Sequence, residues 1–210
     1  MSSVGLLDRL LGRRGDGHQR WVVVDVETSG MDVASDELIS IGAVAMHEDG
    51  HVLPGDSIEI IVQQGQASSR ENILVHGVGV AAQLNGVEPR KAVGLFMEYL
   101  STAPLVAFHA PFDRGFLARV IKFYVNQPFD NPWLDIAELA PALYPTLHLK
   151  SLDEWLVRFG IPVSSRHSAA ADAFATALLA ARLLPEARRQ GAPTFGKMMK
   201  LARNARWLRG

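Results

Sequence analysis

Two carboxylates lie two positions apart at the end of an apolar run near the start of the chain. Asp25 and Glu27 belong to the segment WVVVDVETSG, residues 21–30. β-Branched residues favour an extended strand, and side chains at positions i and i+2 of a strand share one face. Both carboxylates can therefore converge on one cation, and carboxylate oxygens are the ligands that Mg²⁺ and Mn²⁺ prefer. Taken alone, such a pair also fits a strand end that faces water.

Two further acids and a histidine lie near predicted helix starts. Asp113 follows a short apolar strand and opens a predicted helix, where the helix dipole also favours an acid. Asp172 lies on an alanine-rich helical face that His167 precedes. With Ser168 as N-cap, Asp172 also suits an ordinary first helical turn, and His167 an exposed loop. An imidazole is nevertheless the group best suited to take a proton from water near neutral pH.

The elements that must position these groups alternate between strand and helix. Strands are predicted over 21–30, 38–46, 58–62, 105–108 and 133–135. Helices are predicted over 88–100, 113–125, 136–143, 152–159 and 169–184. The first three strands indicate an antiparallel meander, and the strand and helix alternation after residue 100 indicates a parallel part of the sheet. Residues 68–86 have a loop-rich composition.

Composition favours one α/β domain. The 210 residues are 48% hydrophobic and 20% charged, which is enough for one sizeable core. The absence of cysteine excludes disulfides, thiolate catalysis and Cys-ligated zinc, and fits a reducing compartment. With neither a membrane-length apolar run nor an evident signal peptide, we expect a cytoplasmic protein without membrane contact. The net charge of −1 argues against coating of long duplexes but allows a site that grips a few nucleotides.

Two segments flank the predicted domain, which spans residues 21–185. Residues 1–20 combine leucines at helical spacing with a glycine-rich stretch and predict an amphipathic helix and linker, with a frayed tail as the alternative. Residues 186–210 form a basic C-terminal tail, for which a phosphate-tracking patch, a docking surface and a solvated tail are the alternatives. Its basic residues are Arg188, Arg189, Lys197, Lys200, Arg203, Arg206 and Arg209.

Together, the four acids and the histidine resemble the signature of the DEDDh 3′–5′ exonucleases, the family of the proofreading ε subunit of bacterial DNA polymerase III and of ribonuclease T. The three motifs read VDVETSG at 24–30, AFHAPFD at 107–113 and HSAAAD at 167–172. The intervening matches are VHGV at 75–78, LD at 134–135, LKSLD at 149–153 and FGIP at 159–162. Motif order supports the resemblance from about residue 21 to 184. The chain departs from the family at Phe108-His109, where His-Asn is common.

The resemblance implies a ribonuclease-H-like fold, which is a mixed sheet flanked by helices in a single domain. It also implies two Mg²⁺ or Mn²⁺ ions, with Asp25 bridging both ions and His167 as general base. The implied metal ligands are Asp25, Glu27, Asp113 and Asp172. The implied substrate contacts are Thr28, Ser29, His76, His109 and Phe112. Phe116 is an alternative stacking aromatic, and core packing is the other interpretation of both phenylalanines.

These features predict a 3′–5′ exonuclease that releases nucleoside 5′-monophosphates from the 3′ end of DNA, with single-stranded DNA as the preferred substrate and a separate polymerase as a partner. An RNA-trimming exoribonuclease is the alternative within the same class. A catalytically silent nucleic-acid-binding module of the same fold is the alternative from another class, although such a module has no need of four acids and a histidine. A phosphatase or dehydrogenase is excluded because no glycine-rich phosphate loop follows the first strand.

Overall fold

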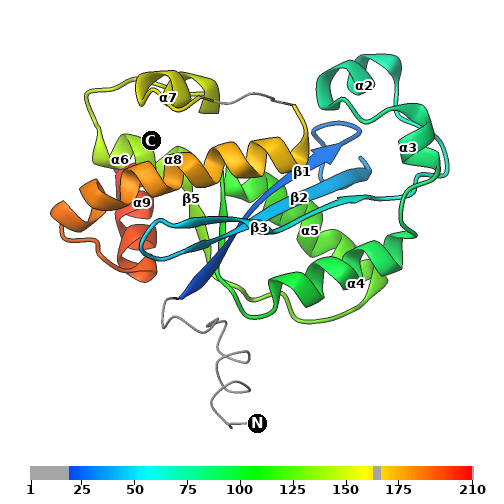
Figure 1. Ribbon diagram of the computed structural model, residues 1–210, viewed down its shortest axis with the longest axis horizontal. Coiled ribbons are helices and arrows are strands. Elements are labelled where there is room, and N and C mark those ends of the chain that lie inside the picture. The colour runs from blue at the N-terminus through cyan, green and yellow to red at the C-terminus, as the bar shows by residue number, and fades with distance from the viewer. Residues whose placement is uncertain (1–18, 163–166, 210) are drawn as a thin grey trace, which may run out of the picture.

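The strand that carries Asp25 and Glu27 is the centre of a five-stranded sheet (Figure 1). The structure is a computed structural model that describes residues 19–162 and 167–209. The strands are β1 (Arg20–Thr28), β2 (Leu38–His47), β3 (Val52–Ile61), β4 (Leu105–Ala107) and β5 (Trp133–Asp135), in the order β3-β2-β1-β4-β5. β2 pairs antiparallel with β1 and β3, whereas β4 pairs parallel with β1 and β5. The predicted mixed sheet is confirmed.

Helices cover both faces of this sheet (Figure 1). They are α2 (Arg70–His76), α3 (Val80–Leu84), α4 (Pro89–Leu100), α5 (Ala110–Tyr124), α6 (Ile136–Leu143), α7 (Leu152–Arg158), α8 (Ala169–Arg189) and α9 (Phe195–Arg209). Val22 and Val24 of β1 pack with α4 and α5, whereas Trp21 and Val23 pack with α6 to α9 on the other face. Because side chains alternate along a strand, Asp25 also points toward the α8 face.

Helix α5 begins three residues earlier than predicted. His109 adopts a left-handed backbone conformation (φ 66°) that turns the chain out of β4, and Pro111 occupies the first helical turn, where its missing N–H costs nothing. Asp113 therefore lies within the first turn instead of opening the helix. This difference matters because it brings the Asp113 carboxylate back toward the end of β1.

The segment 68–86, predicted as loop, forms α2 and α3 around a buried polar network. The His76 side chain is 2% exposed, and its Nδ1 accepts a hydrogen bond from the Val78 N–H at 3.0 Å. Ser68 Oγ lies 3.1 Å from the other ring nitrogen, and the Gln83 side chain donates to Ser68 Oγ at 3.0 Å. Burial lowers the pKa of His76. Polar residues thus take interior positions here, which hides the helical pattern in the sequence.

The C-terminal segment is folded against the sheet. α8 continues through Pro185 to Arg189, and α9 packs on α6 and β5. Phe195 and Met198 of α9 are buried, and the Phe195 ring meets the Trp21 ring edge to face at 4.9 Å. The solvated-tail alternative is therefore wrong for residues 186–205.

The predicted N-terminal helix and most of its linker fall on residues 1–18, which lie outside the described residues. Within the described ranges, no helix combines the length and the apolar character that crossing a membrane requires. β1 begins at Arg20, whose guanidinium pairs with Asp56 of β3 at 2.9 Å. This ion pair thus links the start of β1 to β3, at the edge of the sheet.

Candidate active site

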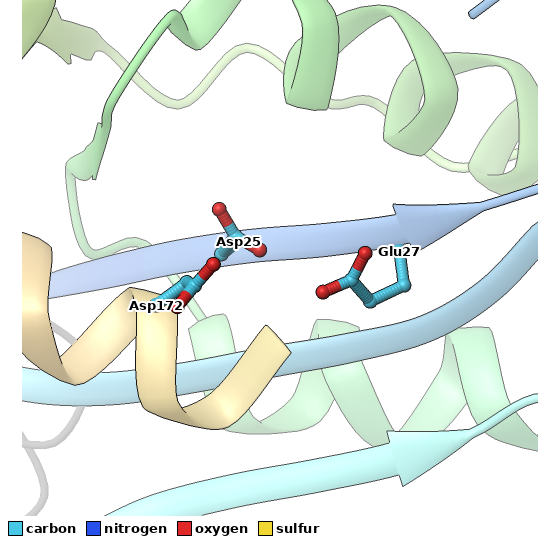
Figure 2. Close-up of side chains that lie close together, drawn as sticks. All are labelled: Asp25, Glu27 and Asp172. Carbon is cyan, nitrogen blue, oxygen red and sulfur yellow. The ribbon is translucent and has the colours of Figure 1, made fainter. Parts of the chain in front are cut away.

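Three carboxylates meet where β1 ends and α8 begins (Figure 2). One oxygen each of Asp25, Glu27 and Asp172 lies within 4.8 Å of the others. Asp25 and Glu27 extend from the same face of β1, and Asp172 reaches them from the first turn of α8. Opposite ligands of an octahedral Mg²⁺ ion are about 4.2 Å apart. The three carboxylates therefore lie close to the spacing that a shared cation requires.

The close approach of α8 to the sheet depends on Gly42. This residue of β2 is the register partner of Asp25. A Cβ atom at Gly42 would lie 2.1 Å from the backbone carbonyl carbon of Ala169 and 2.2 Å from the backbone nitrogen of Ala170. The first turn of α8 thus rests directly on the β2 backbone. Because Gly42 has no side chain, α8 lies close enough to β2 for the Asp172 carboxylate to reach Asp25.

The fourth acid, Asp113, lies beside the cluster and comes from the opposite face of the sheet. Its carboxylate is 3% exposed and accepts a hydrogen bond from the N–H of Val26 at 3.1 Å. Burial raises the pKa of Asp113 well above its ordinary value, and the nearby charges of Asp135 and Glu27 raise it further. Asp113 lines the same cavity as the other three acids, a pocket of about 360 Å³.

His167 stands at this pocket with its side chain exposed. Its backbone is left-handed (φ 65°), and its N–H donates to Asp172 Oδ1 at 3.3 Å. Ser168 then caps α8 by accepting the N–H of Ala171 at 3.3 Å. The turn that starts α8 therefore brings an imidazole and a carboxylate to the same cavity.

The predicted substrate contacts divide between the pocket and the loop after β1. His109 and Phe112 line the pocket. Thr28 Oγ1 instead donates to a carbonyl two residues further on at 2.7 Å, and Ser29 Oγ accepts the N–H of Glu37 at 2.8 Å. Both hydroxyls thus shape the loop, and their contact with substrate stays a prediction.

His76 and Phe116 both lie in the interior, which for Phe116 agrees with the core-packing interpretation, and contact of His76 with substrate stays a prediction. His76 is held inside the α2–α3 network, and Phe116 is fully buried, 5.0 Å from the Phe112 ring between centroids. The apolar walls of the pocket include Met31 and Val75, which are 80% and 65% exposed. Sequence reasoning missed Met31 because an isolated apolar residue in a loop carries no periodic signal, and it quoted Val75 only as part of the motif VHGV without assigning it to the pocket.

Asp135 supports the site from the neighbouring strand. Its Oδ1 accepts the N–H of His109 at 3.1 Å and the N–H of Ala137 at 2.9 Å, which caps α6. Burial raises the pKa of Asp135. The carboxylate therefore ties the end of β5 to the turn that starts α5. That turn contains Phe108-His109, the point where the chain departs from the family pattern.

Comparison with known proteins gives a consistent result. A family model described as an exonuclease matches residues 22–180. The DNA polymerase III subunit epsilon-like protein of Rhodobacter capsulatus is 32% identical over 201 residues, which cover 90% of this chain and 28% of that protein. The DNA polymerase III PolC-type protein of Thermotoga maritima is 29% identical over 185 residues, which cover 88% of this chain and 13% of that protein. The chain spans less than a third of either relative.

Solved structures agree on the architecture. Exonuclease I of E. coli in complex with a dT13 oligonucleotide superimposes with a TM-score of 0.71 at 19% identity, over 82% of this chain and 42% of that chain. At this identity the likeness shows the fold alone. That fold is the sheet and helix arrangement that brings the acidic pocket together.

Proposed function

The chain belongs to the exonuclease family, and from that premise we propose that it is a DEDDh-type 3′–5′ exonuclease that releases nucleoside 5′-monophosphates from DNA. The observation that carries the proposal is the pocket where Asp25, Glu27 and Asp172 converge beside His167. The curated relatives are named as DNA polymerase III proteins, which supports DNA as the substrate and a polymerase as the partner.

The donor set of this pocket fits divalent cations. Its donors are carboxylate oxygens, the ligands of Mg²⁺ and Mn²⁺, and clustered carboxylates repel one another unless cations neutralise them. We propose that Asp25, Glu27 and Asp172, together with Asp113 in the same pocket, would hold these ions. When bound, the ions would supply Lewis-acid activation of water and stabilisation of the charge on the leaving oxygen.

His167 is the proposed general base. An imidazole nitrogen of His167 takes a proton from the attacking water, whose oxygen forms a bond to phosphorus as the bond to the leaving 3′ oxygen breaks. Asp172 positions the base by accepting the His167 N–H. Met31, Val75 and Phe112 form apolar walls that shield the terminal nucleotide from water.

The test of this function uses strands that carry a 5′ label: single-stranded DNA, duplex DNA and RNA of one sequence, each with Mg²⁺, Mn²⁺ or chelator. We expect a descending ladder on DNA that requires the metal. Release of the label as a mononucleotide would show the opposite direction, and a ladder on RNA alone would assign the alternative substrate. Strand binding without cleavage under all conditions would contradict the proposal in favour of a binding module.

Gly42→Ala is expected to lower both stability and turnover. The added methyl group must displace the backbone of α8 from β2; overpacking of this kind costs about 1–3 kcal/mol, and a misplacement of about 1 Å costs about 10²-fold in rate. Thermal unfolding and single-turnover cleavage measure the two effects. Gly55→Ala is the matched control, because nothing lies within 4 Å of a Cβ there. Wild-type turnover in Gly42→Ala would show that the close packing of α8 on β2 is not needed to position the carboxylates.

A further inference from the structure

A second groove lies on the other side of the first turn of α5. Its volume is about 520 Å³, and it is lined by α5, β5, α6 and α9. Ala110, Pro111 and Arg114 of α5 line this groove, whereas Phe112 and Asp113 of the same turn line the acidic pocket. A single helical turn therefore separates the two cavities.

Small side chains and hydrogen-bond donors both line the groove. Ala118 and Ala202 line it and have small side chains, so an extended chain can approach the backbone closely. Arg114 of α5 and Arg203 of α9 are both exposed and reach the groove from different elements. Trp133 also lines it, and the buried indole N–H of this residue has no hydrogen-bond partner among the described residues. The two guanidinium groups suit an anion with several acceptor oxygens.

Basic residues lie on two walls of the groove. On α9 the exposed face presents Lys197, Lys200 and Arg203. The acid Asp135 also lines the groove, but its Oδ1 is already engaged by two backbone N–H groups. Glu138 of α6 is the other acid on the wall. The basic residues lie on the α5 and α9 sides, and the acids lie on the α6 side.

We propose that this groove holds the phosphate backbone of the substrate strand on the 5′ side of the nucleotide being removed. The inference rests on the proposed function, because the strand is placed by its 3′ end in the acidic pocket. A strand that leaves the pocket over the N-terminal turn of α5 passes the positive end of that helix dipole and meets Arg114 one turn later, then Arg203. A partner protein is the competing occupant.

The test compares substrate lengths in the Arg114→Ala/Arg203→Ala double variant. Loss of two exposed ion pairs with phosphate is expected to weaken binding by about 2- to 30-fold. We expect KM for a single strand of about twenty nucleotides to rise about 10-fold with kcat unchanged, and both constants for a trinucleotide to stay at wild-type values. The slope of log affinity against log salt should fall by about 1.4, since each single-strand phosphate contact contributes about 0.7. Arg182→Ala, an exposed arginine of α8 outside the groove, is the control.

Binding of a fluorescent strand of the same length in the presence of chelator separates this proposal from the proposed function. Weaker binding by the double variant supports the groove even if wild-type protein cleaves nothing. Equal strand affinity in the variant and in wild type would overturn the proposal and assign the groove to a protein partner. A KM increase that is the same for the trinucleotide and the long strand would also overturn it, because the arginines would then act at the 3′ end. Glu138→Gln removes a negative charge from the wall and should tighten long-strand binding.

Discussion

Asp25→Asn is expected to abolish cleavage and, at the same time, to stabilise the metal-free protein. The carboxylates of Asp25, Glu27 and Asp172 have oxygens within 4.8 Å of one another. At that distance two charges repel by roughly 1 kcal/mol even in a water-like medium. Removing one charge relieves this repulsion, so the unfolding temperature in chelator should rise by about 2–4 °C for a chain of this size.

The loss of turnover follows from the loss of the bound cation. Metal activation is worth several kcal/mol, and each 1.36 kcal/mol corresponds to tenfold in rate, so we expect turnover to fall by at least about 10³-fold. Mn²⁺ should raise the unfolding temperature of wild type and have little effect on Asp25→Asn. Thermal unfolding with and without Mn²⁺, calorimetric Mn²⁺ titration and single-turnover cleavage measure the three effects.

Asp130→Asn is the matched control because Asp130 is an exposed acid in the loop before β5. Its removal should change neither the metal response nor the cleavage rate. A metal-free Asp25→Asn protein that is less stable than wild type would contradict the clustered-charge account. Normal cleavage by that variant would contradict the proposed metal site itself.

The positions of the acids on β1 could be predicted because they depend on local structure. The alternation along β1 is a property of the strand itself, and it places Asp25 on the α8 face whatever packs there. Several helix starts are equally local. Ser151 and Glu154 form a capping box at α7, and Glu88 caps α4 just before Pro89. Such signals lie within a few residues and need no knowledge of the fold.

Features that depend on distant contacts could not be predicted in the same way. Nothing in the sequence around Gly42 indicates that the backbone of α8 packs against this residue. The burial of Phe195 requires Trp21 of β1 as its partner, across most of the chain length. The network of His76 and Gln83 places polar residues in the protein interior, and a polar stretch of this kind predicts a loop when only the hydrophobic pattern is used. Sequence spacing therefore identified the acids, but not the tertiary contacts that hold them in position.

The separate environment of Asp113 is another consequence of tertiary structure. The motif pattern groups Asp113 with Glu27 and Asp172, whereas the structure clusters Asp25, Glu27 and Asp172 and holds Asp113 on the backbone N–H of Val26. That hydrogen bond joins the start of α5 to the segment between Asp25 and Glu27. Asp113 thereby couples the two faces of the sheet at the site, a role that follows from geometry and not from residue type.

His167→Ala is expected to lower turnover by about 10²–10⁴-fold, the usual contribution of a general base. The imidazole lines the acidic pocket, but it is not part of the cluster of Asp25, Glu27 and Asp172. Mn²⁺ affinity should therefore remain near the wild-type value. Added imidazole should restore part of the rate in this variant, because a free base can then enter the vacated space. Single-turnover rates with and without imidazole measure both effects.

The left-handed backbone of His167 (φ 65°) requires a second variant, because alanine adopts that conformation poorly. Asparagine tolerates it well and supplies no base, so His167→Asn should be as slow as His167→Ala if the lost function is proton transfer. Recovery of the rate in His167→Asn would instead assign the effect to the turn that starts α8. His148→Ala, an exposed histidine between α6 and α7, should cleave normally. Near-wild-type turnover of both His167 variants at neutral pH would place the general base elsewhere, since the carboxylates alone would then suffice to activate the water.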